Sequence, residues 1–320
     1  MIILSFAPAP GLAETTPELR SGSHLVLIFG LGMIGHAIAD ALHGLGFQRR
    51  VDVHFPWDDA EMRLRAGNRI EAACHQMACE RGTQLSVVWS AGKSGFTSDF
   101  TELNRENDAF EDTLNLIERL RGLLRAQSLK VHYISSAGGL FEGQQVVGHS
   151  SRPAPLRAYG EMKIHQERRL AKRLAGTEKV IYRPSSVYGP HSRNHRHGLI
   201  NHLVSNGRRA RVTVLDAHVM ALRDYVFSGD IGQYVARRIH FGSDCVDDPR
   251  AHFLVSSRCA SIFEVVGKIE RVLNLKLPIR YDENFGNHRN ITFRESVQPV
   301  GWHPSSLEVG IRQFLLHPAG

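Results

Sequence analysis

The sequence has few of the features that mark disulfide-stapled, metal-binding or membrane-spanning proteins. Its 320 residues include four cysteines and no Cys-x-x-Cys pair, so neither a zinc ribbon nor a disulfide framework is indicated. No apolar run approaches the eighteen residues that a membrane helix needs. We therefore expect no bound metal, no membrane partner and a reducing, cytoplasmic location.

The chain also lacks internal repeats, low-complexity tracts and an excess of acidic residues. Hydrophobic residues make up 42% and charged residues 22%, which is typical of a globular protein with a large buried core. The 39 Lys and Arg exceed the 32 Asp and Glu. This balance fits an anionic partner and equally fits a mildly basic, well-solvated surface.

Two basic clusters invite a more specific interpretation. Arg208, Arg209 and Arg211 are not accompanied by a nucleic-acid-binding module, so we expect no nucleic acid partner. The histidine-rich stretch 191–197 has no carboxylate or cysteine partner and no helical register, which disfavours a metal site. It is interpreted as a basic loop around a diphosphate or as a solvated loop.

Residues 1–22 stand apart from the rest of the chain. Their apolar stretch is short, ends before Pro8 and lacks the basic start of a secretory leader. We expect a disordered or poorly packed N-terminal extension.

From Ser23 onward, segments of strand length alternate with segments of helical spacing. Strands are expected at 24–29, 51–55, 85–92, 130–139 and 179–190, and helices at 36–45, 58–82, 102–126 and 159–174. This alternation predicts an α/β fold, a doubly wound parallel-sheet Rossmann domain covered by helices on both faces. We expect that domain over 23–190, completed by about 222–255, with a smaller C-terminal lobe in 191–320.

Glycines directly follow the first of these strands. Gly30, Gly32 and Gly35 form G-x-G-x-x-G between a strand and a helix, a context that favours a turn binding the diphosphate of a dinucleotide. A turn that serves only strand-to-helix packing is the alternative. Met33 and Ile34 lie within the same turn and are expected to contact the cofactor.

The second and third strands suggest further cofactor contacts. Asp52 lies near the place where an acid would hold the adenosine ribose of NAD, whereas the adjacent arginines at 49 and 50 would suit the phosphate of NADP. The choice between NAD and NADP stays open, with NAD slightly favoured. Ala91 and Gly92 end the third strand and are expected to face the cofactor, and Lys93 could reach cofactor or substrate or lie on the surface.

Tyr159 and Lys163 are four residues apart, and therefore lie on one face of a helix. An ammonium beside a phenol favours the phenolate, so the pair could take a proton from a hydroxyl and return it. The strand before this helix ends at Ser135 and Ser136, and a hydroxyl there could bond the same substrate oxygen.

Together with these residues, two strings carry a resemblance to a known family. Residues 182–190 read YRPSSVYGP and residues 223–231 read RDYVFSGDI. The chain resembles the extended short-chain dehydrogenases/reductases of the NAD-dependent nucleotide-sugar epimerase/dehydratase family over about residues 24–316.

The resemblance implies a role for each matching residue. Tyr159 would be the acid/base, Lys163 would hold the nicotinamide ribose, and Ser136 (or Ser135) would bind the reacting oxygen. The remaining positions would line the nicotinamide pocket or meet the sugar-nucleotide diphosphate: Pro184, Ser185 and Ser186 for the pocket, with Ser186 nearest the substrate, and Arg223 for the diphosphate.

The sequence also departs from the family pattern. In the family, a further strand and an acid that normally contact adenine precede the strand corresponding to 85–92. They have no counterpart between Trp57 and Gln84, although Trp57 could stack on the ring. The residues after Ser136 are Ala-Gly-Gly rather than the Asp-Glu of the family's 4,6-dehydratases, which disfavours dehydration.

We therefore expect an NAD(P)-dependent epimerase that acts on a nucleoside-diphosphate sugar through a transient keto intermediate. The alternatives are an NADPH-dependent reductase of a 4-keto sugar nucleotide and, in a different class, a non-catalytic dinucleotide-sensing or RNA-binding relative. The resemblance further implies surface polysaccharide biosynthesis and a homodimer through the helices at 102–126 and 159–174.

Overall fold

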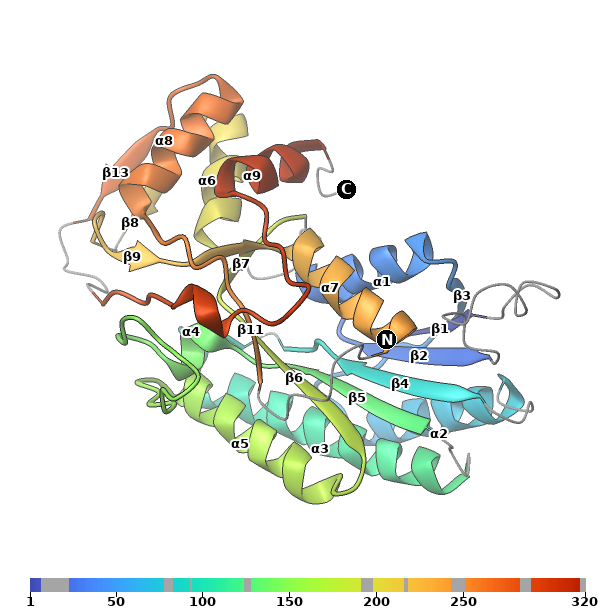
Figure 1. The fold of residues 1–320 in the computed structure, drawn as a ribbon. Coiled ribbons are helices and arrows are strands. Elements are labelled where there is room, and N and C mark those ends of the chain that lie inside the picture. Colours follow the sequence, from blue (N-terminus) through green and yellow to red (C-terminus); the bar gives the residue numbers. More distant parts are fainter. Residues whose placement is uncertain are drawn as a thin grey trace.

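A computed structural model gives the fold of the chain (Figure 1). It describes residues 1–6, 23–77, 83–92, 94–123, 128–190, 198–215, 218–242, 251–282 and 289–316. The stretch 191–197, Lys93 and residues 7–22 lie outside the described residues.

A seven-stranded sheet forms the larger part of the molecule. Its strands, in spatial order, are β11 (His252–Leu254), β6 (Glu178–Pro184), β5 (Ser128–Ile134), β4 (Gln84–Trp89), β2 (His24–Phe29), β1 (Ile2–Phe6) and β3 (Gln48–Asp52). All neighbouring strands from β2 to β11 are parallel. Because helices cover both faces, these strands are buried along much of their length, and β2 is buried at every residue.

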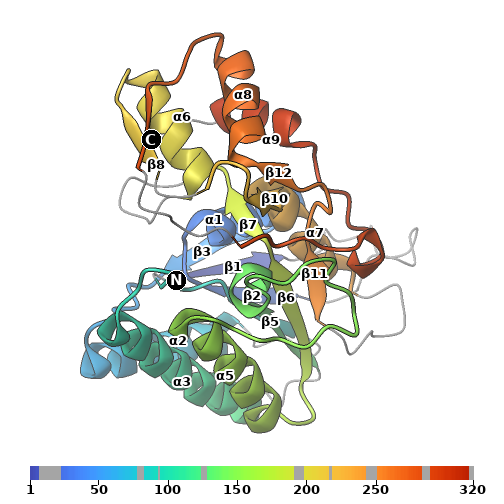
Figure 2. The ribbon, with the colours of Figure 1, turned by 90° about the vertical axis from the view of Figure 1, so that its left-hand side faces the viewer.

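Helices lie on both faces of this sheet (Figures 1 and 2). On one face lie α2 (Ala60–Met77), α3 (Phe100–Leu123) and α5 (Ala158–Arg173), and on the other lie α1 (Met33–Gly44) and α7 (Ser228–Phe241). The short helix α4 (Ala137–Leu140) follows β5. The predicted doubly wound α/β fold is confirmed.

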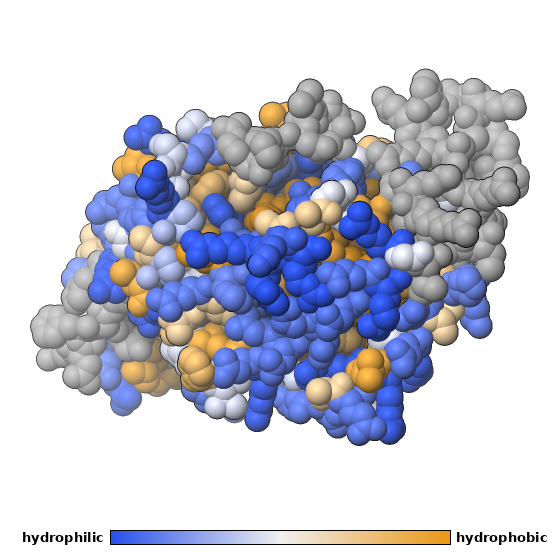
Figure 3. Space-filling view, turned by 90° about the horizontal axis from the view of Figure 1, so that it is seen from below, coloured by the Kyte–Doolittle hydropathy of each residue, from blue (hydrophilic) through white to orange (hydrophobic). Residues whose placement is uncertain are grey.

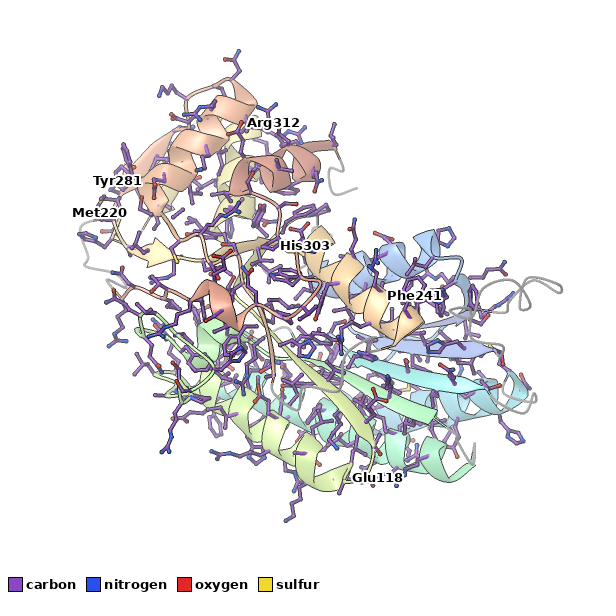
Figure 4. The ribbon with its side chains drawn as sticks, viewed as in Figure 1. Glu118, Met220, Phe241, Tyr281, His303 and Arg312 are labelled. Carbon is purple, nitrogen blue, oxygen red and sulfur yellow. The ribbon has the colours of Figure 1, made fainter. Side chains whose placement is uncertain are left out.

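A smaller lobe sits beyond the carboxyl ends of the strands. Its helices are α6 (Leu199–Arg208), α8 (Ile262–Leu273), α9 (Leu307–Leu316) and the 3-10 helix η1 (Glu295–Val297). Its strands form three pairs: β7 (Ser186–Tyr188) with β10 (Tyr225–Phe227), β9 (Leu222–Arg223) with β12 (Ala260–Ser261), and β8 (Thr213–Leu215) with β13 (Ile279–Tyr281). The lobe has an apolar cluster of its own. Figure 4 labels Met220, Tyr281 and Arg312 around it. Within the described ranges, no helix combines the length and apolarity that crossing a membrane requires.

The first residues of the chain belong to the sheet, so the expectation of a disordered or poorly packed extension is wrong for them. Strand β1 runs antiparallel between β2 and β3 and pairs with both. Ile2, Ile3 and Leu4 are at most 3% exposed. A short apolar run suffices for this, because it adds hydrogen-bonded partners on both sides and buries both faces at once.

The inserted strand also moves the second strand of the predicted fold. Residues 48–52 pair with β1, with Ile2 opposite Asp52 and Ser5 opposite Gln48, so this strand begins and ends about three residues before the predicted 51–55. The described residues between β3 and β4 form helix α2 and no further strand, as the sequence indicated.

Candidate active site

The glycine turn packs tightly against the end of β4. Gly30 has φ +86°, and a Cβ atom on it would lie 2.3 Å from the Cα of Ala91. A Cβ on Gly35 would lie 1.9 Å from the carbonyl oxygen of Gly30. Both positions therefore require glycine, because any side chain would collide with backbone.

The same turn leaves the start of α1 open. A Cβ on Gly32 would meet nothing within 4 Å, and α1 has no side-chain N-cap and no acid in its first turn. The amides of Met33 and Ile34, at the positive end of the helix dipole, are thus free of any competing carboxylate. The glycine turn and the first residues of α1 therefore fit a bound diphosphate.

Ser90 fixes this turn, and the sequence analysis missed it. Its hydroxyl donates to the carbonyl oxygens of Gly30 at 2.6 Å and Phe29 at 3.1 Å. A serine at the carboxyl end of the neighbouring parallel strand was the available signal.

A hollow of about 380 Å³ adjoins the turn on the side of β3. Its lining includes Gly30, Asp52 and Trp57, together with Met1 just before β1. Asp52 is exposed and forms an ion pair with Arg49. Trp57 packs edge-on against Trp89, with ring centres 5.8 Å apart. The hollow is placed and lined as an adenosine site would be.

Tyr159 lies in the first turn of α5 and faces the short helix α4. A Cβ on Gly139 would be 2.9 Å from Cε1 of Tyr159 and 3.4 Å from Oγ of Ser136, so the phenol ring and this hydroxyl both adjoin the same glycine. Phe96 packs edge-on against the Tyr159 ring at 5.9 Å. Tyr159 and Ser136 both remain partly exposed.

The two adjacent serines have different partners. Ser136 caps α4 by accepting the backbone N–H of Gly139, which leaves its own O–H free to donate to a substrate oxygen. Ser135 is buried and donates to Glu167 at 2.6 Å, so its hydroxyl is used inside the protein. Of the two predicted serines, Ser136 is the one beside Tyr159.

Lys163 lies one turn further along α5 and is deeply buried. Its ammonium is 5.8 Å from the centre of the Tyr159 ring and 2.8 Å from Oε1 of Glu106 on α3. Burial opposes the charged form, but the Glu106 carboxylate and the neighbouring tyrosines outweigh it, and the pKa of Lys163 is raised. Glu106 is a second residue that the sequence analysis missed.

A continuous set of contacts joins the two halves of the site. Gly30 abuts Ala91, and the next residue, Gly92, lies against the Glu106 carboxylate. Glu106 in turn holds Lys163. The glycine turn, the end of β4 and the Tyr159 face of α5 therefore form one site at the carboxyl edge of the sheet.

The residues after β6 lie deeper than expected. Pro184 ends β6 and is buried, and Ser185 is buried with its hydroxyl bonded to Asp224. The Ser185 hydroxyl is thus engaged within the protein, whereas Ser186 is partly exposed. Burial raises the pKa of Asp224 despite its bonds from Ser185 and Ser256.

Arg223 is partly buried at the edge of the smaller lobe. Its guanidinium donates to the backbone carbonyls of Leu222 and Arg289, and burial lowers its pKa, with Arg157 adding to this and Tyr225 and Glu142 opposing it. The contact with Arg289 is through its backbone carbonyl, so part of the Arg223 guanidinium is used within the protein.

The fold and these residues define a class of protein. A doubly wound sheet, a glycine turn that fits a diphosphate, and a Ser, Tyr and Lys set at the same edge are the arrangement of short-chain dehydrogenases/reductases. The sequence profile of the NAD dependent epimerase/dehydratase family matches residues 26–242. The chain belongs to this family.

Solved structures of similar fold include three sugar-nucleotide enzymes. UDP-glucose 4-epimerase of Thermus thermophilus has a TM-score of 0.70 and 17% identity, with 91% of this chain and 97% of that chain covered. UDP-glucuronic acid 4-epimerase of Bacillus cereus has a TM-score of 0.67 and 16% identity over 91% and 98%. dTDP-glucose 4,6-dehydratase of Bacillus anthracis has a TM-score of 0.61 and 17% identity over 78% and 76%. A search of curated protein sequences gives no match.

Proposed function

We propose that the protein is an NAD-dependent epimerase that acts on a nucleoside-diphosphate sugar through a transient keto intermediate. The observation that carries this proposal is the placement of Tyr159 and Ser136 against the same residue, Gly139, in a site that a series of contacts connects to the glycine turn. A non-catalytic dinucleotide sensor has no need of such a set.

The chain's own residues would manage the proton and the orientation of the sugar. Bound NAD supplies hydride acceptance and hydride return at the sugar carbon. Tyr159 takes the hydroxyl proton as the carbonyl forms and gives it back as the hydroxyl is restored, while Ser136 donates to the same oxygen. Return of the hydride to the opposite face of the keto sugar would invert the configuration without net oxidation, and Tyr159 would end in the protonation state in which it began.

The absence of an acid next to Ser136 supports epimerisation over dehydration. Gly138 and Gly139 occupy the positions after Ala137, so no side chain there can move the second proton of an elimination. Glu142, which follows, has a fully buried side chain, and both its oxygens accept Nε–H of Arg157. Its carboxylate is therefore held away from such a role.

The substrate proposal rests on the relatives and on the basic edge of the smaller lobe. The Thermus and Bacillus cereus proteins carry UDP-sugar names, and the latter is bound to UDP-glucuronic acid. Arg223 would meet the diphosphate of such a substrate. Surface polysaccharide assembly remains a proposal that follows from this substrate class.

NAD is the favoured cofactor over NADP. The related structures named above contain NAD. In this chain Arg49 is paired with Asp52, and Arg50 donates to Ser5 at 2.6 Å. A ribose phosphate would meet the Asp52 carboxylate and have to break an existing ion pair.

Tyr159→Phe tests the proposed function. We expect sugar-nucleotide conversion to fall about 10²- to 10⁴-fold, since the acid/base is lost, while NAD binding is retained. The substrate panel is UDP-glucose and UDP-glucuronic acid, with products separated by chromatography and reduced nicotinamide followed by absorbance. Tyr281→Phe is the matched control, because Tyr281 is exposed on β13 of the smaller lobe (Figure 4).

Two results would contradict the proposal. Conversion by Tyr159→Phe at the parent rate would remove Tyr159 as the acid/base. Substrate-linked consumption of NADPH by the parent protein would identify a reductase instead.

We also propose that the protein forms a homodimer and lies in the cytoplasm. The outer side of the helix layer formed by α2, α3 and α5 is mostly hydrophilic (Figure 3). Arg169 and Arg173 of α5 form ion pairs with Glu111 and Glu118 of α3. A dimer through these two helices would therefore join charged rather than apolar surfaces.

A further inference from the structure

A buried ion pair lies directly behind the proposed acid/base. The side chains of Lys163 and Glu106 are 5% and 3% exposed, with Nζ and Oε1 2.8 Å apart. Oε2 of Glu106 accepts the backbone N–H of Ser94 at 3.2 Å. Both oxygens of the carboxylate thus have a defined partner, one on α5 and one after β4.

Among the described residues, the surroundings of the pair contain other polar groups but no second carboxylate bonded to Lys163. Gln166 accepts from Lys163 at 3.3 Å and from Tyr133 at 2.7 Å. Glu167, an acid on α5, is bonded to Ser135 and Arg183. The guanidinium of Arg157 lies over the ring of Phe96, which itself packs against Tyr159. In the described part of the chain, Glu106 is the carboxylate that forms an ion pair with Lys163.

When a lysine amine is removed from water, the group in contact with it decides whether the amine stays protonated. A lysine in a site of this depth tends to lose its proton, since burial stabilises the neutral amine. A carboxylate in direct contact reverses that preference. Breaking a buried pair by removing one partner is correspondingly costly, because the remaining ion is left uncompensated.

We propose that Glu106 is a positioning residue of the active site, which keeps Lys163 in the ammonium form and fixes its Nζ beside the ring of Tyr159. The catalytic role of the Tyr159 site in this inference rests on the proposed function. The charge of Lys163, in contrast, can be measured in the protein without substrate or cofactor. Glu106 contacts neither of the proposed reacting groups, Tyr159 and Ser136, through any described hydrogen bond, and so acts through Lys163.

The test is the titration of Lys163, followed by nitrogen NMR of lysine side chains in the full-length protein. The Lys163 signal is assigned as the one lost in Lys163→Met. In the parent protein we expect this amine to stay protonated to strongly alkaline pH. In Glu106→Gln, which preserves shape and removes charge, we expect the midpoint to fall by about two pH units or more. Glu106→Asp should give an intermediate midpoint, since it keeps the charge at a longer distance.

Glu111→Gln is the matched control. Glu111 lies on the same helix and binds Arg169 and Arg173 on the outer face, so its loss should leave the Lys163 midpoint unchanged. If Glu106→Gln fails to fold, Glu106→Met, which also removes the charge, takes its place, and a parent-like midpoint in the folded Met variant overturns the proposal. A parent-like midpoint in a folded Gln variant overturns it as well.

A second measurement separates positioning from a merely structural role. In the pH profile of the sugar-nucleotide conversion rate, the fall in rate at alkaline pH should begin at a lower pH in Glu106→Gln than in the parent protein. In Glu106→Asp it should shift back toward the parent value. A packing defect would instead lower the rate equally at every pH. The NMR titration needs neither substrate nor turnover. Failure of the sugar-nucleotide assay therefore leaves the Glu106 result standing, and an unchanged Lys163 leaves the Tyr159→Phe result standing.

Discussion

At the scale of single residues, the glycines of this chain divide by what surrounds them. Gly30 combines a positive φ with contact to the backbone of β4. Gly267, in the middle of α8, is exposed, and a Cβ there would meet nothing within 4 Å. The same substitution should therefore have opposite effects at the two positions.

We expect Gly30→Ala to lower the free energy of unfolding, or to abolish dinucleotide binding if the turn shifts instead. Gly267→Ala should raise the free energy of unfolding by up to about 1 kcal/mol, because alanine is the better helix former. Urea denaturation of both variants, with a dinucleotide titration of the first, measures these changes. A Gly30→Ala protein with parent stability and parent affinity would show that the tight turn is dispensable.

The residues that could be predicted from sequence are those with a local signal. The glycine turn, Tyr159, Lys163 and Ser136 stand at fixed spacings within single elements. Glu106 has no such signal, because an acid on a largely polar helix is expected to face water. Its burial depends on a lysine 57 positions later in the chain, and only the packing of α3 on α5 reveals it.

At the scale of elements, β1 has the largest effect on the architecture. It separates β3 from β2, and the residue just before it, Met1, lines the hollow beside Asp52. The position of the predicted adenosine site thus depends on a strand that precedes the glycine turn in the chain.

Ile3→Ala tests the contribution of this strand. Ile3 is fully buried in the core cluster beneath the sheet, so we expect a loss of about 2–5 kcal/mol in the free energy of unfolding. Leu64→Ala on α2 is the control, because Leu64 is 56% exposed and should change stability by no more than about 0.5 kcal/mol. Equal, small effects of the two substitutions would mean that β1 is not part of the stable sheet.

Between residues 24 and 190, most helices and strands could be placed from sequence within a few residues, since their apolar spacing is set by their own geometry. Strand β1 could not, because five residues carry little periodicity and their pairing partners come later in the chain. The edges of β3 were misplaced for the same reason, as its pairing with β1 sets them.

At the scale of the whole molecule, stability should depend on pH through buried histidine. His132 on β5 is fully buried, and its Nδ1 lies 2.9 Å from the hydroxyl of Tyr182. Its Nε2 has no hydrogen-bond partner among the described residues. Burial, and then the positive charges of Lys130 and Arg238 and the rings of His24 and His252, lower the pKa of His132 well below 6.5.

A depressed histidine pKa makes the folded state bind fewer protons than the unfolded chain. The full contribution of this residue is therefore present above about pH 6.5 and is lost as the pH falls below that value. We expect the free energy of unfolding to decrease between about pH 6.5 and pH 5 by up to about 1.4 kcal/mol per pH unit for this single group. His132→Gln should flatten that slope, whereas His36→Gln, at an exposed position of α1, should not. An unchanged slope in His132→Gln would assign the acid sensitivity to other groups.

The place of Met1 has a practical consequence for handling the protein. Its backbone nitrogen lies 3.0 Å from the carbonyl oxygen of Val53, and the residue borders the hollow next to the glycine turn. A purification tag fused ahead of Met1 would begin at the lining of that hollow, and we expect it to compete with any adenosine moiety there. A tag after α9 would emerge from the smaller lobe instead, and preparations tagged at opposite ends should differ in dinucleotide affinity.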